Sequence, residues 1–170
     1  MKIIRTKIPE NSLLYPNLNS YNYIDSYEGI VNDKNNVVNI MDVGKAFFKP
    51  NSKWVDGLLI LRNTIVSIFG LKTTKSINNT KQPDNLKFES GEQAGLFRVF
   101  DRTNDEIILG EDDKHLDFRL SLLLAEYEND PTKKVITITT VVKFNNWFGR
   151  LYFFPVKPFH KLIVSKGLKK

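Results

Sequence analysis

Residues 96–144, LFRVFDRTNDEIILGEDDKHLDFRLSLLLAEYENDPTKKVITITTVVKF, decide the fold. The stretch contains four apolar or β-branched runs, at 96–100, 106–109, 114–127 and 135–144. Polar turn-forming residues separate these runs, and side chains that alternate with a period of two are typical of strands with one buried face. The stretch therefore predicts an antiparallel meander of four strands.

The residues before the meander predict a strand and two helices. Residues 1–22, rich in Asn, Ser and Pro, predict an irregular arm, and a short apolar run predicts a first strand at 27–31. Apolar residues then recur at three- and four-residue steps over 38–47 and again over 51–70, which is helical periodicity. The polar composition of 73–91 predicts a long surface loop.

Apolar residues at helical spacing return at 147–168, after the meander. Pro155 and Pro158 fall inside this segment, so we expect a helix that is kinked or begins only near Pro155. An antiparallel sheet with one apolar face needs a cover, and this helix is the obvious one. The order predicts an α+β fold, with the arm at 1–22 followed by one domain at 23–170.

Composition excludes several classes of protein. The 170 residues are 41% apolar and include no cysteine, so there is material for one core but none for disulfides, thiolate zinc sites or a cysteine nucleophile. Arg62, Asn63 and Thr64 interrupt the longest apolar stretch, so it should not span a membrane. Lys2 and Arg5 stand where a secretory signal would be apolar, so we expect a soluble cytoplasmic protein.

The basic charge belongs to the C-terminal quarter. Residues 1–130 hold 16 Lys and Arg against 19 Asp and Glu, whereas 131–170 hold nine Lys and Arg and no acid. Such a segment can meet phosphates, anionic lipid or an acidic partner. Nucleic acid would require basic groups on a broad face with exposed aromatics, and the aromatics here fit a buried helix stripe better, so we do not expect it.

The densest polar cluster lies at 110–119, GEDDKHLDFR. In a strand His115, Asp117, Arg119 and Ser121 project from one face, and the apolar residues between them project from the other. His115 and Asp117 are the candidate catalytic pair, as general base and orienting acid. The same row also fits a solvated face with surface ion pairs. By buried area we expect the apolar row to face the core and the polar row to face outward, unless a second layer covers it.

No metal or cofactor is expected. The three acids at 111–113 lack the spacing of a calcium loop. The sequence also has no glycine-rich phosphate loop, no Gly-x-Ser-x-Gly elbow and no His-Glu-x-x-His motif. The common nucleotide, hydrolase and zinc-protease classes therefore have no support.

The aromatic and basic residues at 147–161 suggest a ligand site. One interpretation is a helix lining an apolar cavity, with basic groups at its mouth for an anionic end. A helix in a membrane interface and a core helix with a solvated edge are the alternatives. The candidate ligand-binding residues are Arg119, Trp147, Arg150, Tyr152, Phe154, Lys157, Phe159 and His160.

Several segments resemble one family in the right order. They are GEDDKHLDFR at 110–119, TTVVKF at 139–144, GRLY at 149–152, VKPFH at 156–160 and the upstream DSY at 25–27. Together they resemble the bacterial domain-of-unknown-function family numbered 2867, over about residues 20–168. That family is uncharacterised, so the resemblance implies no reaction.

The predicted topology is also similar to the helix-grip architecture of the START and Bet v 1 type (SRPBCC-like) superfamily, although the meander looks one or two strands short. This resemblance implies a cavity between the sheet and the C-terminal helix, and we expect a small apolar or amphipathic molecule as the partner. The alternatives are an enzyme or substrate domain using His115 and Asp117, and an interaction module that docks its basic segment on anionic lipid or an acidic protein. A membrane surface ranks below the small molecule. Whether the chain is an enzyme stays open.

Overall fold

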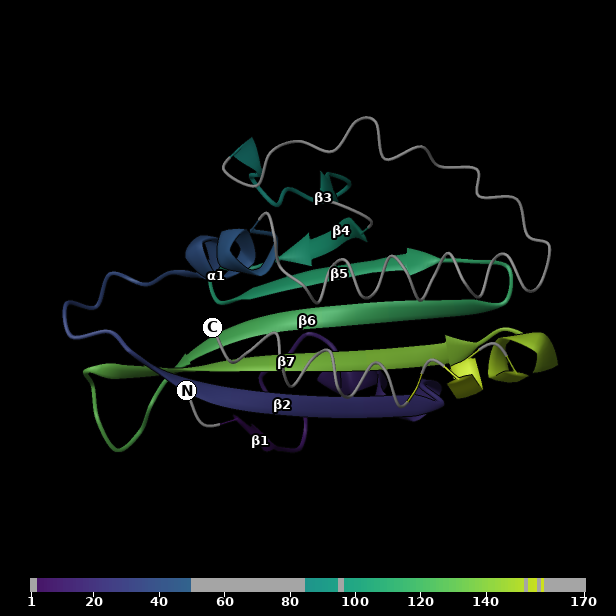
Figure 1. Cartoon of the computed structure of the whole chain (residues 1–170), viewed down its shortest axis with the longest axis horizontal. Coiled ribbons are helices and arrows are strands. Elements are labelled where there is room, and N and C mark those ends of the chain that lie inside the picture. Colours follow the sequence, from purple (N-terminus) through teal and green to yellow (C-terminus); the bar gives the residue numbers. More distant parts are fainter. Residues whose placement is uncertain (1–2, 50–84, 95–96, 152, 156, 158–170) are drawn as a thin grey trace.

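The computed structural model describes residues 3–49, 85–94, 97–151, 153–155 and 157 (Figure 1). The predicted helix at 51–70, most of the predicted loop at 73–91 and the end of the C-terminal segment lie outside these residues. The described part is dominated by an antiparallel sheet of seven strands in the order β1-β2-β7-β6-β5-β4-β3. The α+β class and the antiparallel sheet are therefore confirmed.

The long strands β2, β7, β6 and β5 run side by side in the centre of the sheet (Figure 1). The seven strands are β1 (Ile3–Arg5), β2 (Tyr23–Asn32), β3 (Gln93–Ala94), β4 (Phe97–Arg102), β5 (Glu106–Asp112), β6 (Leu116–Glu126) and β7 (Lys133–Phe144). The four predicted strands of the meander correspond to β4 through β7. The first long strand, β2, pairs with the last strand, β7, so strands that are far apart in the sequence lie side by side.

One short helix, α1 (Ile40–Phe47), follows β2. It begins two residues later than the periodicity suggests, because Asn39 caps it: the Asn39 side chain accepts from the backbone N–H groups of Met41 and Asp42. The Asp42 carboxylate accepts in return from the Asn39 backbone N–H, at 3.1 Å. This reciprocal capping box satisfies the first donors of the helix and fixes its start.

The apolar row of β6 faces the main core, as predicted. Leu120, Leu122 and Leu124 are buried in one cluster with residues of α1, and both α1 and the segment at 86–88 lie on this side of the sheet. The cluster consists of Tyr27, Ile40, Val43, Leu86, Phe88, Ala94, Val99, Ile107, Leu109, Leu120, Leu122, Leu124 and Ile138. Burial of these large side chains, at about 1.5–3 kcal/mol each, fixes the register of the strand.

The N-terminal arm covers part of the opposite face, which corrects the expectation of an irregular arm. It contains β1 and a 3-10 helix, η1 (Tyr15–Ser20). A second apolar cluster forms between the arm and the sheet, from buried Leu14, Ile108 and Val141. The arm is therefore a second layer that covers part of the face on which the polar row of β6 lies.

A buried carboxylate joins this arm to the sheet. Glu106 of β5 is only 2% exposed. It accepts from the Ser12 hydroxyl at 2.6 Å, from the Leu13 backbone N–H at 2.7 Å and from the Ser121 hydroxyl. A buried charge is stabilised when its oxygens have such donors.

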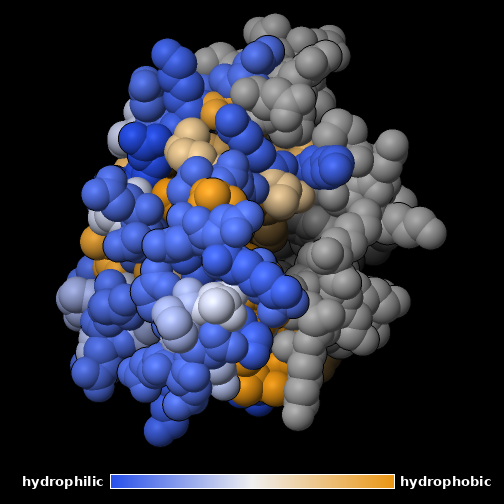
Figure 2. Space-filling model, turned by 90° about the vertical axis from the view of Figure 1, so that its left-hand side faces the viewer, coloured by the Kyte–Doolittle hydropathy of each residue, from blue (hydrophilic) through white to orange (hydrophobic). Residues whose placement is uncertain are grey.

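The end of the sheet that carries the β2–α1 and β6–β7 connections is mostly hydrophilic, with hydrophobic residues only in small separate spots (Figure 2). The buried acid Asp33 holds the β2–α1 connection at this end through hydrogen bonds and an ion pair. Burial alone would raise the pKa of Asp33, but hydrogen bonds from the backbone N–H groups of Val37 and Val38 and the charge of Lys134 lower it overall. The Lys134 ammonium lies 3.2 Å from the Asp33 carboxylate and donates to the Val38 carbonyl.

Candidate functional site

Asp117 lies on the face of β6 opposite the main core, and His115 immediately precedes the strand; each is half-buried. Asn145 donates to the Asp117 carboxylate at 2.9 Å, and the Asn146 amide lies 3.1 Å from Nδ1 of His115. The His115 ring also packs against Phe148, with centroids 4.6 Å apart. The two candidate catalytic residues thus contact different asparagines.

These contacts hold the start of the C-terminal helical segment against β6. Residues 147–151 are helical, and Asn146 caps them by accepting from the Gly149 backbone N–H at 3.1 Å. A Cβ at Gly149 would lie 2.1 Å from the His115 carbonyl oxygen, so only glycine permits this approach. The polar row near His115 and Asp117 therefore has a structural role, which is to seat the helical segment.

Arg119 is engaged within the protein. Its guanidinium forms an ion pair with Asp112 at 2.7 Å, donates to the Phe118 carbonyl and stacks 3.5 Å from the centre of the Phe100 ring. These contacts lie on the face that the arm covers. The sequence suggested that Arg119 meets the anionic end of a ligand, but in this arrangement that charge is already paired.

The C-terminal candidates divide into two groups. Trp147, Arg150 and Phe154 are exposed, so they do not lie between the helical segment and the sheet. Lys157 is also exposed, but its ammonium reaches the Tyr23 ring of β2. Tyr152, Phe159 and His160 lie outside the described residues. The backbone is already helical at 147–151, so the helical segment begins before Pro155.

Among the described residues, Phe153 packs between this segment and the sheet. Its ring lies 4.8 Å from that of Tyr23 and 5.6 Å from that of Phe144, and it is buried with Leu116 and Val142. The Lys157 ammonium lies 5.3 Å from the Tyr23 ring centre. Direct ring contact leaves no space for a ligand at this point of the interface.

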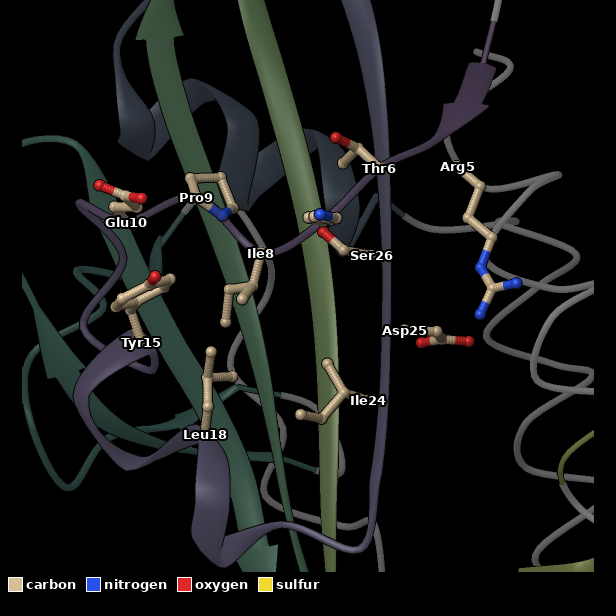
Figure 3. A pocket seen from close by; sticks show the side chains of 11 residues that line it. Arg5, Thr6, Ile8, Pro9, Glu10, Tyr15, Leu18, Ile24, Asp25 and Ser26 are labelled. Atoms are coloured by element: carbon tan, nitrogen blue, oxygen red, sulfur yellow. The ribbon is translucent and has the colours of Figure 1, made fainter.

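A cleft that the sequence did not suggest opens between the arm and the edge of β2 (Figure 3). Its volume is about 630 Å³, and it is open to solvent. Its lining residues come from both segments and are Arg5, Thr6, Lys7, Ile8, Pro9, Glu10, Tyr15, Leu18, Ile24, Asp25 and Ser26. We call this the arm cleft. It exists because β1 pairs with only three residues of β2, Tyr27 to Gly29, and the arm then crosses to the other face.

The arm cleft has an apolar side and a charged side. Ile8, Leu18 and Ile24 point toward one another on one side of β2, and Ile8 and Ile24 also pack on the second apolar cluster (Figure 3). On the other side the Arg5 guanidinium points toward the Asp25 carboxylate (Figure 3). This division is suited to a molecule that is itself apolar at one end and polar at the other.

Asp25 is the buried acid among the lining residues of this site, at 3% exposed. The Tyr23 hydroxyl donates to its carboxylate at 2.6 Å. Burial raises the pKa of the Tyr23 phenol, and the hydrogen bond to Asp25 and the negative charge of Asp25 raise it further. Burial and then Asp25 also raise the pKa of Tyr27, while Arg5 acts in the opposite direction. Both phenols therefore stay neutral and can act as hydrogen-bond donors.

The sequence carried only a weak signal for this site. Asp25 precedes the short run at 27–31 that predicted the strand, and it stood out only as part of the DSY motif. The arm gave no signal, because its contribution depends on where it crosses the sheet. Within the described residues no group of three or more His, Asp and Glu is placed to hold a metal ion. No helix among them has the length and apolar content needed to cross a bilayer.

Comparison with known families gives one match. Residues 17–167 match the model of a family described as protein of unknown function, DUF2867. The chain belongs to DUF2867. No curated protein and no solved structure matches it. The DUF2867 region begins inside η1, so it includes Leu18, Ile24, Asp25 and Ser26 of the arm cleft but not the residues before position 17.

Proposed function

We propose that this protein binds a small amphipathic molecule in the arm cleft. The observation that carries the proposal is a cleft of about 630 Å³ with an apolar wall and a charged wall. Sites for small organic ligands commonly occupy roughly 300–1,000 Å³ and combine a mostly apolar lining with a few polar groups that fix orientation. The arm cleft meets both criteria.

The charges indicate how such a molecule would lie. Its apolar part packs against Ile8, Leu18 and Ile24. Arg5, beside Asp25 (Figure 3), and Lys7 are exposed cations that line the cleft, and they can meet an anionic end. The preferred class is therefore a small carboxylate or phosphate with an apolar body.

A helix-grip arrangement of the whole chain is part of the same proposal. The strand order supports it, because the first long strand pairs with the last and the remaining strands follow as a meander. With β3, the meander has five strands, one more than the sequence suggests. The predicted cavity beneath the C-terminal segment involves residues outside the described ones, and Phe153 fills the described part of that interface. The arm cleft is therefore the preferred site.

Native mass spectrometry of the purified full chain, followed by denaturing extraction, tests this proposal. We expect a retained small acid, and we expect Arg5→Gln combined with Lys7→Gln to weaken its retention by about tenfold, since each removes a charge-assisted contact. Lys34→Gln, which removes an exposed cation at the opposite end of β2, should retain the molecule as the wild type does. If the molecule is retained equally in the Arg5/Lys7 variant and in an Ile24→Ser variant, the arm cleft is not its site.

A further inference from the structure

We propose that the C-terminal helical segment docks on an anionic lipid surface through an exposed apolar stripe. The stripe consists of Trp147, Leu151 and Phe154, and we call it the lipid stripe. It is separate from the arm cleft, which contains none of these residues. The proposal therefore does not depend on the ligand proposed above.

The first argument is geometric. The three residues are spaced by four and three positions, which places them on one face of a helix. Trp147 is 74% exposed, Leu151 49% and Phe154 79%. The other exposed large apolar residues of the described part lie singly or in the arm and the strands, and none of them forms a stripe along a helix.

The buried side of the same segment shows that the lipid stripe points away from the protein. Gly149 approaches the His115 carbonyl, and Phe153 is buried on Tyr23 and Phe144. Gly149 and Phe153 are four residues apart and define the face that packs on the sheet. The stripe lies on a different face from Gly149 and Phe153, although the Trp147 ring meets that of Phe148 edge-on, with centroids 6.0 Å apart.

The second argument is charge. Arg150 and Lys157 are exposed, and each is three residues from an aromatic member of the lipid stripe. The Lys157 ammonium lies over the Tyr23 ring, so it borders the stripe on the side that faces β2. Lys143, at the end of β7, is also exposed. Residues 131–170 carry nine basic residues and no acid. Two acids of the described part lie near the start of the segment: Asp113, which is exposed and whose carbonyl accepts from Asn145, and Asp117 of β6, whose carboxylate accepts from Asn145. Basic residues beside an apolar stripe complement anionic headgroups.

The shape of the stripe favours a bilayer over a protein partner. Trp and Phe side chains with three quarters of their surface exposed protrude from the molecule. A protein would need a matching groove to bury them, whereas the interfacial region of a bilayer accepts protruding aromatic rings. Arg and Lys can bury their methylene stems there and keep their charges at the headgroups. The segment would lie in the interface with its stripe facing the acyl chains.

Vesicle co-sedimentation of the full chain tests the proposal. The vesicles contain either phosphatidylcholine alone or phosphatidylcholine with roughly one-third phosphatidylglycerol. We expect binding to the anionic vesicles that weakens as salt is raised, and much weaker binding to the neutral vesicles. Combining Trp147→Ser with Phe154→Ser should reduce binding by about tenfold or more, because it removes most of the apolar area of the stripe.

Two further variants separate the apolar and charge contributions. Arg150→Gln with Lys157→Gln should reduce binding several-fold and flatten its salt dependence. The matched control is Val37→Ser with Lys34→Gln, which changes an exposed apolar and an exposed basic residue at the opposite end of the sheet. This control should bind as the wild type does. All of the substituted residues are exposed, and circular dichroism verifies that each variant is folded.

A fluorescence measurement gives an independent readout. The chain has two tryptophans, so in a Trp54→Phe chain the emission comes from Trp147 alone, and it should shift to shorter wavelength with anionic vesicles. The difference between wild type and Trp147→Phe gives the same signal if the Trp54 variant does not fold. The proposal is overturned if the anionic vesicles do not bind the protein, or if the Trp147/Phe154 variant binds them equally well. It is also overturned if the stripe instead joins two copies of the chain, which sedimentation velocity would show as a dimer lost in that variant.

Discussion

The attachment of the arm to the sheet should depend on the carboxylate of Glu106. This side chain is 2% exposed and accepts three hydrogen bonds, from Ser12, Leu13 and Ser121. We predict that Glu106→Ala lowers the free energy of unfolding by about 3–5 kcal/mol, because it leaves buried donors without an acceptor at roughly 1–3 kcal/mol each and also opens a cavity. The effects are not additive, because an arm that detaches regains water as a partner.

The isosteric change Glu106→Gln should cost less, about 1–2 kcal/mol. The amide oxygen can still accept from the Leu13 backbone N–H, which can only donate. The amide nitrogen then faces the hydroxyls of Ser12 and Ser121, which can rotate to accept from it. What is lost is mainly the extra strength of hydrogen bonds to an ionised group. Glu106→Gln should therefore be more stable than Glu106→Ala, because a hydroxyl can change from donor to acceptor whereas a backbone N–H can only donate.

Urea unfolding measures both values, and hydrogen exchange measures the local effect. The Leu13 amide should be protected in the wild type, less protected in Glu106→Gln and unprotected in Glu106→Ala. Glu128→Gln, at an exposed position between β6 and β7, is the control and should change neither measurement. If Glu106→Ala lost less than about 1 kcal/mol and the Leu13 amide stayed protected, the carboxylate would not be what holds the arm.

Three other predictions concern Gly149, Asp33 and Tyr23. Gly149→Ala should lower stability by about 1–3 kcal/mol in urea unfolding, because its Cβ would collide with the His115 carbonyl. Lys134 and backbone donors depress the pKa of Asp33, so the stability that this acid provides is present above about pH 4 and is lost as the pH falls below that value. Asp33→Asn should therefore flatten the acid limb of stability in unfolding curves recorded from about pH 2 to about pH 6. The raised pKa of Tyr23 predicts the opposite limb: stability falls above about pH 10, where only the unfolded phenol ionises, and Tyr23→Phe should reduce that fall.

The meander was predictable because its signal is local. Alternation along β6 fixed both the strand and its inward row, since Leu120, Leu122 and Leu124 share one face and bury more apolar area than the polar row can offset. β2 contains the strand predicted at 27–31, but the prediction was too short. Its early half, from Tyr23, contains Asp25 and Ser26, whose polar side chains hide the pattern of a strand even though both are buried.

The candidate sites were less predictable because they depend on contacts between distant segments. The row from His115 to Ser121 has the same pattern whether it faces solvent, a ligand or another part of the chain. Ser121 meets Ser12 at the Glu106 carboxylate, and this contact spans more than a hundred residues of sequence. The pattern of 147–157 predicted a helix and its basic edge, but it could not show which aromatic side chains pack inward. Phe153 does so, while its neighbour Phe154 is 79% exposed.

The two proposed surfaces use different parts of the fold, and this separation lets each test serve as a control for the other. The arm cleft requires the arm to be docked, so Glu106→Ala should release a ligand bound there. The same variant leaves the seat of the helical segment intact, because His115, Asn146 and Gly149 make no contact with Glu106 among the described hydrogen bonds. Vesicle binding should then persist in Glu106→Ala, whereas the Trp147/Phe154 variant should lose vesicle binding and keep the ligand. If instead both activities fell together in either variant, the cleft and the stripe would be coupled, and the ligand and the lipid surface would have to be considered as one site.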